Sequence, residues 1–220
     1  MKRSVTSSAE AMYWPGFGPG YHLVRGLVKT IFPPVFRLLY GWRITGKEHL
    51  SGLDSAITLC NHVHTLDCVM MAIALQHKDL LVLSLPENLH KPLVGGIVRT
   101  AGAVAVPQGP AEYRVFYRRA AQDLAAGRFL HIYPEGWLVP GCRTLRDFHP
   151  GAFQMALRFG VPVVPCVLRH YRRKNGREGL ELCILPPLTA DSALGKRQAA
   201  EDLEARARAA MEQAIAETAE

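Results

Sequence analysis

His62 and Asp67 are the residues of this chain best suited to moving a proton. They follow an apolar run at residues 56–60 and stand where a helix is predicted to begin. In open α/β sheets, functional sites form at the carboxyl ends of strands. If the intervening turn brings the two side chains together, the carboxylate orients the imidazole and leaves its other nitrogen free as a general base. The chain has no Gly-x-Ser-x-Gly nucleophile elbow, so the expected nucleophile is a hydroxyl of the substrate.

Two other interpretations of these residues remain open. A histidine and an aspartate at a helix start can simply cap the helix. His62-Val63-His64 also resembles the first part of the H-x-H-x-D-H pattern of metal-dependent hydrolases. Asp67, however, falls one place later than in that pattern, and Cys68 follows it. A metal-dependent hydrolase using His62, His64 and Asp67 is therefore the alternative enzyme hypothesis.

A second segment suited to binding follows an apolar strand predicted at residues 129–133. It reads Pro134-Glu135-Gly136-Trp137. Glycine lets the backbone approach a ligand closely, and a carboxylate directly after a strand can bind a polar group. This turn is a candidate site for binding a polar group of the substrate that carries the reacting hydroxyl.

Short apolar runs alternate with helical patterns along most of the chain. Strands are predicted at residues 43–45, 56–60, 80–84, 104–106, 129–133, 163–168 and 180–185. Helices are predicted at residues 67–76, 92–101, 111–126, 151–159 and 196–219. Fully apolar strands separated by helices indicate an α/β fold with a mostly parallel sheet covered on both faces. Asn175-Gly176 predicts a terminal antiparallel hairpin.

The N-terminal segment is predicted to form an amphipathic helix pair. Residues 21–32 carry leucine and isoleucine at four-residue spacing, Pro33-Pro34 ends this helix, and residues 35–42 begin another. The pair either lies in a bilayer interface, with Arg25, Lys29 and Arg37 near lipid phosphates, or packs on the core. Residues 1–42 are accordingly assigned as a membrane-docking helical segment and residues 43–220 as a catalytic α/β domain.

Composition and charge limit the class of protein. The 220 residues are 49% hydrophobic and 20% charged, which is typical of a globular domain and excludes disorder. The net charge of +7, concentrated near the N-terminus, favours an anionic partner such as a membrane surface. Five cysteines without a C-x-x-C pair indicate a reducing compartment. No signal peptide or spanning helix is apparent, so a peripheral protein on the cytoplasmic face of a membrane is expected.

Four blocks of residues, in order, resemble the glycerol-phosphate and lysophospholipid acyltransferase family, which includes 1-acylglycerol-3-phosphate acyltransferase. His62 and Asp67 are similar to the family's H-x4-D motif, and the resemblance covers roughly residues 43–187. The other three blocks are Glu87 with Pro92, Gly95 and Gly102, then Tyr133 to Gly136, and then Val161 to Pro165. A lead-in at Gly46 to Leu50 and an element at Phe148 to Ala152 are also similar to the family.

The resemblance implies an O-acyltransferase that moves a fatty acyl group from acyl-CoA or acyl carrier protein to a lysolipid hydroxyl. It implies no covalent intermediate, metal or other cofactor, and no nucleic-acid partner. His62 would be the general base and Asp67 its orienting partner. Glu135 and Gly136 would belong to the acceptor pocket, and Gly102 and Pro162 to the donor site. A non-catalytic basic lipid-binding module remains the alternative outside the enzymes.

The chain departs from the family pattern at two places. Arginines that grip the acceptor phosphate in the family are replaced by Gln108 and Leu138. Neither side chain reproduces the charge-assisted bonds of an arginine fork. Either Arg143 or Arg146 compensates, or the acceptor is not lysophosphatidate. In the latter case Trp137 would supply an apolar wall for a different lysolipid.

Overall fold

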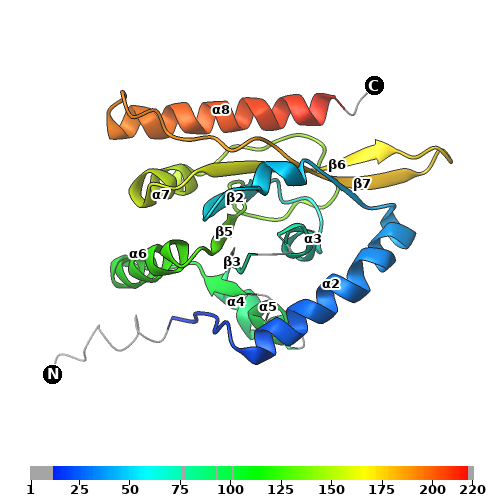
Figure 1. Cartoon of the computed structure of the whole chain (residues 1–220), viewed down its shortest axis with the longest axis horizontal. Helices are drawn as coiled ribbons and strands as arrows, with labels where there is room; N and C mark the ends of the chain where they lie inside the picture. The colour runs from blue at the N-terminus through cyan, green and yellow to red at the C-terminus, as the bar shows by residue number, and fades with distance from the viewer. Residues whose placement is uncertain (1–11, 76–77, 93, 101, 218–220) are drawn as a thin grey trace.

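A computed structural model describes residues 12–75, 78–92, 94–100 and 102–217. Its strands are β1 (Arg43–Thr45), β2 (Ala56–Cys60), β3 (Leu80–Ser84), β4 (Ala103–Ala105), β5 (Phe129–Ile132), β6 (Val163–Arg172) and β7 (Glu178–Ile184). Its helices are α2 (Pro19–Tyr40), α3 (Asp67–Ala74), α4 (Pro86–His90), α5 (Val94–Thr100), α6 (Pro110–Ala125), α7 (Gly151–Phe159) and α8 (Lys196–Ala216), with a 3-10 turn at Lys47–Leu50. The predicted α/β class is confirmed (Figure 1).

The strands form one seven-stranded, mostly parallel sheet in the order β1-β7-β6-β2-β5-β3-β4. β2 lies between β5 and β6 and is parallel to both. The predicted antiparallel hairpin is β6–β7, joined through Asn175-Gly176. It is not the edge of the sheet, because β1 pairs in parallel with β7 on the outside. The carboxyl ends of β2 and β5 therefore lie side by side, and the residues that follow the two strands are neighbours at this end of the sheet.

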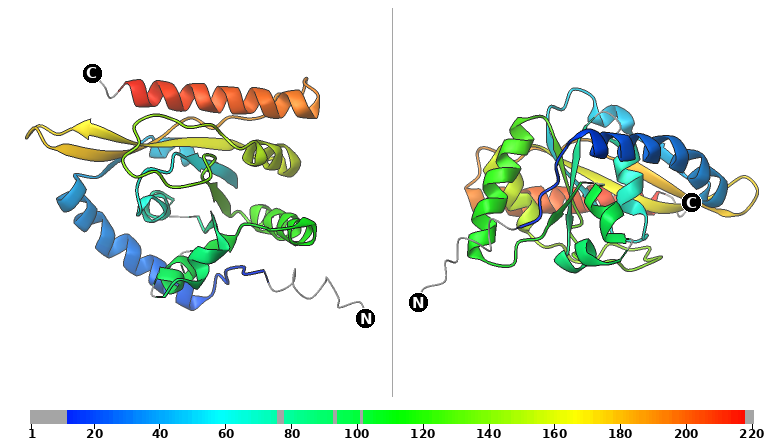
Figure 2. Two further views of the ribbon diagram at one scale, coloured as in Figure 1. Left: turned by 180° about the vertical axis from the view of Figure 1, so that it is seen from behind. Right: turned by 90° about the horizontal axis from the view of Figure 1, so that it is seen from below.

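Apolar side chains cover both faces of this sheet. On one face the core includes Phe116 of α6, Phe153 of α7 and Leu203 of α8. On the other it includes Phe36 of α2 and Met70 of α3. Both views of Figure 2 show these two groups of helices with the sheet between them. Large apolar side chains buried in this way each stabilise the fold by about 1.5–3 kcal/mol.

The predicted N-terminal helix pair is instead one continuous helix. Helix α2 carries Pro33 and Pro34 in its interior, although each proline removes a backbone donor and costs about 3 kcal/mol in an ordinary helix. Packing beyond the prolines opposes this cost, because Phe36 is only 1% exposed. Its ring contacts those of Phe32 and Trp42 at centroid distances of 5.4 and 5.6 Å. Residues 1–11 of the predicted docking segment lie outside the described residues.

Most other predicted elements are found within a few residues of their expected ends. The helix predicted at residues 92–101 is found as α5, and the short helix α4 before it was not predicted. Residues 76, 93, 101, 218 and 219 of the predicted helices lie outside the described residues. Within the described ranges, no helix is both long and apolar enough to cross a bilayer.

Candidate active site

The turn after β2 brings His62 and Asp67 into direct contact. Nδ1 of His62 lies 2.7 Å from Oδ2 of Asp67, the first residue of α3. The carboxylate is 1% exposed, whereas the imidazole is 22% exposed. An ionised carboxylate can only accept, so Nδ1 carries the proton and Nε2, on the other side of the ring, is left with a lone pair. The arrangement is that of an oriented general base.

Tyr133, directly after β5, completes the support of this pair. Its hydroxyl donates a hydrogen bond to Oδ1 of Asp67 at 2.7 Å. Its ring stacks on the His62 imidazole with centroids 3.9 Å apart and planes inclined by 17°. Burial, and secondly the Asp67 charge, raise the pKa of Tyr133 well above its usual value, so the hydroxyl stays protonated as a donor. Tyr133 therefore restrains both members of the pair.

His131 lies beneath this arrangement, fully buried on β5. Its Nδ1 pairs with the Thr58 hydroxyl at 2.9 Å, and its ring contacts the edge of Tyr133 at a centroid distance of 4.6 Å. Burial lowers the pKa of His131 to about 4, with the His62 ring adding to the effect and Asp67 opposing it. A neutral imidazole therefore forms the floor of the site.

Asn61 anchors the turn that carries His62. Its amide, only 2% exposed, donates to the Leu168 carbonyl at 3.0 Å and accepts from the Leu168 amide at 2.8 Å. The polar end of β2 is thereby held against β6. The position of His62 is thus set by a neighbouring strand as well as by its own turn.

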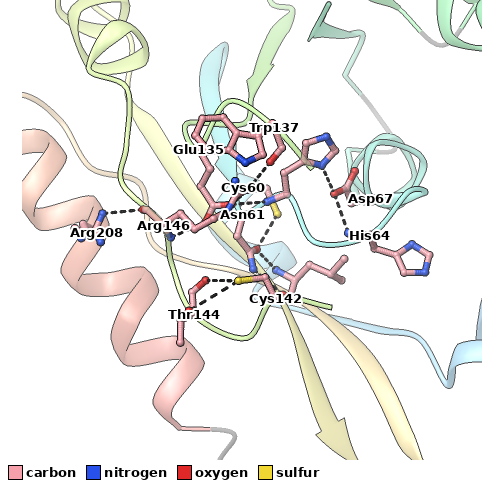
Figure 3. A network of polar contacts seen from close by, with 12 residues as sticks. Cys60, Asn61, His64, Asp67, Glu135, Trp137, Cys142, Thr144, Arg146 and Arg208 are labelled. Atoms are coloured by element: carbon pink, nitrogen blue, oxygen red, sulfur yellow. Dashed lines mark hydrogen bonds and ion pairs between the residues drawn. The ribbon is translucent and has the colours of Figure 1, made fainter. Parts of the chain in front are cut away.

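Glu135 is buried beside His62, and its hydrogen bonds are made with the protein. Its carboxylate accepts from the His62 backbone amide at 3.2 Å and from the Arg146 backbone amide at 3.1 Å. The Arg146 guanidinium forms an ion pair with the same carboxylate and also donates to the Trp137 carbonyl. Figure 3 shows this network continuing to Arg208, which donates to the Arg146 carbonyl at 2.9 Å. This geometry favours a positioning role for Glu135 over direct contact with an acceptor.

Gly136 and Trp137 lie at the mouth of the site. Gly136 has φ +84°, and a Cβ there would stand 2.9 Å from Nε2 of His149, so the close approach of His149 requires glycine. Trp137 is 59% exposed, and the Arg146 guanidinium lies 5.1 Å from its ring. An exposed indole beside the base is available as the apolar wall that the sequence predicted.

Arg143 lies at the surface on the far side of Asn61. It forms an exposed ion pair with Glu178. It also lines a cavity of about 140 Å³ together with Asn61 and His170. Arg143 is therefore close to the site, while Arg146 is held by Glu135.

Gly102 and Pro162 lie at the amino ends of the strands, whereas His62 follows the carboxyl end of β2. Gly102 immediately precedes β4, and a Cβ there would stand 2.1 Å from the Leu80 carbonyl. The Pro162 carbonyl accepts from the Ile57 amide at the start of β2. Both residues shape the amino ends of strands, and the structure does not bring them to His62. Their positions favour structural roles over contact with a donor at the reacting centre.

The three candidate metal ligands do not converge. Nδ1 of His64 accepts from the Leu66 amide at 3.1 Å, and its ring packs against Tyr40. Asp67 is already shared by His62 and Tyr133. Among the described residues, no group of three or more histidine, cysteine or acidic side chains is arranged to hold a metal ion. This geometry gives no support to the metal-hydrolase alternative.

Sequence reasoning did not select Tyr133 or Asn61 as functional residues. Both were quoted only as parts of motifs, although each is the first polar position after a buried strand. Their partners are distant in sequence, since Tyr133 bonds to Asp67 and Asn61 to Leu168. The prediction that β2 and β5 are parallel was the signal that could have placed Tyr133 beside Asp67.

Comparison with known proteins agrees with this fold and assigns the family. Residues 41–169 match the family described as Acyltransferase, and the chain belongs to that family. A lyso-ornithine lipid O-acyltransferase from Pseudomonas aeruginosa is 35% identical over 116 residues, which are 52% of this chain and 43% of that protein. The crystal structure of the 1-acyl-sn-glycerophosphate (LPA) acyltransferase PlsC from Thermotoga maritima has the same fold, with a TM-score of 0.62. The match spans 88% of this chain and 81% of the PlsC chain, and the two sequences are 18% identical.

Proposed function

We propose that this protein is an O-acyltransferase that moves a fatty acyl group from acyl-CoA or acyl carrier protein to the hydroxyl of a lysolipid. The observation that carries the proposal is the 2.7 Å contact between Nδ1 of His62 and the buried Asp67 carboxylate. It leaves Nε2 of a partly exposed imidazole as the base. Membership of the acyltransferase family supports the same reaction class.

The chemistry requires no nucleophile from the protein. Nε2 of His62 takes the proton of the lipid hydroxyl as its oxygen attacks the thioester carbonyl. The new C–O bond forms, the C–S bond breaks, and the proton passes from His62 to the departing thiolate. Asp67 stabilises the imidazolium that exists between these two transfers, and Tyr133 keeps the carboxylate aligned with it.

We propose further that the acceptor is a lysolipid with an amino-acid head group rather than lysophosphatidate. Gln108 and Leu138 replace the two arginines expected for phosphate binding, and Arg146 is engaged by Glu135. Ornithine carries amino and carboxyl groups but no phosphate. The similarity to a lyso-ornithine lipid O-acyltransferase supports this class of acceptor.

The membrane-docking element in this proposal is α2. Its outer side carries a stripe of exposed apolar residues, here called the apolar stripe: Leu23, Leu27, Ile31, Val35, Leu38 and Leu39. Such a stripe on an amphipathic helix suits the boundary between head groups and acyl chains. The Tyr40 ring at the end of α2 contacts His64, with centroids 5.1 Å apart. A docked α2 would therefore hold the edge of the sheet with His62 near the bilayer.

An acyl-transfer assay with mass-spectrometric detection tests the reaction. Purified protein is given lyso-ornithine lipid, lysophosphatidate and lysophosphatidylcholine with either donor. We expect transfer chiefly to lyso-ornithine lipid, with loss of about 10²–10⁴-fold in kcat for His62→Ala. His90→Ala, at an exposed histidine outside the site, is the matched control. Normal turnover by a folded His62→Ala protein, or no transfer by wild type, would refute the proposed mechanism.

Vesicle co-sedimentation tests the docking. Leu27→Ser with Leu38→Ser should weaken binding, because each lost apolar side chain removes about 1.5–3 kcal/mol of burial in the membrane. Leu194→Ser is the control, an exposed leucine just before α8. Substitution is preferable to deletion, since Phe36 of the same helix belongs to the core. Unchanged binding by the double variant would exclude the apolar stripe as the docking surface.

A further inference from the structure

A second concave region lies far from His62 and is strongly basic. It has a volume of about 520 Å³ and is formed by α2, the segment before β3 and the turn between α6 and β5. We call it the α2 basic pocket. Its ionisable lining residues are His22, Arg25, Lys29, Lys78, Asp79 and Arg128. Four lysine and arginine side chains face one carboxylate, so the formal charge of the lining is +3 with His22 neutral.

Asp79 does not neutralise the pocket. It pairs with Arg25 at 3.1 Å and lies 3.9 Å from Arg128, which also binds Asp123 outside the pocket. Arg25 is 8% exposed, yet its Nε has no hydrogen-bond partner in the protein, and the same is true of Nε of Arg128. The guanidinium groups of Arg25 and Arg128, which both line the pocket, thus each retain one unused donor. Buried donors of this kind are satisfied by a ligand or by water.

The two lysines add charge at the open side. Burial, and secondly the charge of Arg25, lower the pKa of Lys29, while the charge of Asp79 opposes them. Lys78 donates one hydrogen bond to the Asp54 carbonyl at 2.9 Å, and an ammonium group has three donors. A phosphate placed between these side chains would relieve the repulsion and accept charge-assisted bonds.

The pocket adjoins the apolar stripe of α2. His22 is followed by Leu23, and Gly26 by Leu27, and successive residues of a helix are turned by about 100°. Leu23 and Leu27 are 66% and 52% exposed. A Cβ added at Gly26 would meet nothing within 4 Å, so the helix leaves open space on that side. In a bilayer, lipid phosphates lie immediately above the level at which such leucines insert.

We propose that the α2 basic pocket binds the phosphate of an anionic membrane phospholipid such as phosphatidylglycerol. This inference rests on the proposed docking of α2. The pocket is not the acceptor site, because Arg128 and Tyr133 flank β5 and the five residue steps between them span about 17 Å. It lies at the first half of α2, whereas Tyr40 at the other end contacts His64. A bound phospholipid would therefore fix how α2 lies on the membrane and so the orientation of the active site.

Co-sedimentation with phosphatidylcholine vesicles, with and without phosphatidylglycerol, tests the pocket. The pocket variant is Lys29→Gln with Lys78→Gln, and Lys29→Gln alone serves if the double variant is unstable. The charge-matched control is Lys196→Gln with Arg197→Gln at the start of α8, which Figure 1 shows on the other side of the molecule from α2. We expect the pocket variant to lose about thirtyfold in affinity for the anionic vesicles, at roughly fivefold per charge. Its affinity for neutral vesicles should stay at the wild-type value.

The outcomes separate the pocket from the docking. Equal losses of affinity for anionic vesicles in the pocket variant and the control would refute phosphate binding in the pocket. The proposed docking of α2 would then still stand. Failure of the wild-type protein to bind either vesicle would overturn both. Unchanged vesicle binding with a raised KM for acyl-CoA would assign the pocket to the phosphates of the donor, which also overturns the proposal.

Discussion

The hydroxyl of Tyr133 and the carboxylate of Asp67 are joined by a 2.7 Å hydrogen bond that ties the end of β5 to the start of α3. The other oxygen of the same carboxylate binds His62. Since Tyr133 also stacks on the imidazole, one side chain limits the movement of both His62 and Asp67.

Removing the hydroxyl of Tyr133 should affect catalysis more than binding. Tyr133→Phe keeps the stacked ring but leaves Oδ1 of the buried Asp67 without its donor. Hydrogen bonds to charged groups contribute about 1.5–3 kcal/mol, so we expect kcat to fall roughly tenfold with little change in KM. Tyr171→Phe is the control, because its hydroxyl makes an equally short bond to the Gly41 carbonyl away from the site. A fall in kcat of similar size in both variants would contradict the positioning role.

Glu135 offers a test that separates positioning from acceptor binding. Glu135→Gln leaves the mostly buried Arg146 guanidinium without its anion and should destabilise the fold by about 3 kcal/mol. If Glu135 positions His62, kcat falls while KM for the lysolipid is unchanged. If it binds the acceptor, KM rises instead. Adding Arg146→Met should recover part of the stability, and Glu87→Gln, at an exposed position, is the neutral control. Urea unfolding and steady-state kinetics provide the measurements.

Acceptor choice should respond to position 138. Leu138→Arg restores an arginine where the family pattern has one, and a charge-assisted contact with phosphate is worth about 1.5–3 kcal/mol. We expect kcat/KM for lysophosphatidate, relative to lyso-ornithine lipid, to rise at least about tenfold. Leu138→Met controls for the change in side-chain length. An unchanged ratio in the arginine variant would mean that phosphate discrimination lies elsewhere.

His131 should make stability depend on pH. Its folded-state pKa of about 4 lies below the ordinary histidine value, so the unfolded chain binds a proton that the folded protein excludes. Stability is therefore lost as the pH falls from about 7 towards 4. Between pH 7 and pH 5 this single group should lower the free energy of unfolding by about 2 kcal/mol. Urea unfolding at the two pH values should show a smaller difference for His131→Gln, and an unaltered one for His90→Gln. The same slope in all three proteins would contradict the prediction.

The sequence by itself determined the class of fold, and it singled out His62 and Asp67 as the candidate pair. Apolar runs separated by helical patterns predicted the parallel sheet, since strands buried on both faces must be apolar throughout. Asn175-Gly176 predicted the β6–β7 hairpin because its turn conformation is a local property. His62 and Asp67 were recognisable because both lie in one short segment whose spacing is itself a signal.

Only the tertiary structure decided what surrounds that pair. Tyr133 meets Asp67, and Glu135 meets the His62 backbone, because β5 happens to lie beside β2 in the sheet order. Gly102 and Pro162 lie at the amino ends of the strands because they precede their strands instead of following them. Helix α2 continues through Pro33 and Pro34 against its local propensity, with Phe36 beyond them packed in the core. Strand order and packing depend on contacts between residues distant in the chain, and a local pattern carries little information about such contacts.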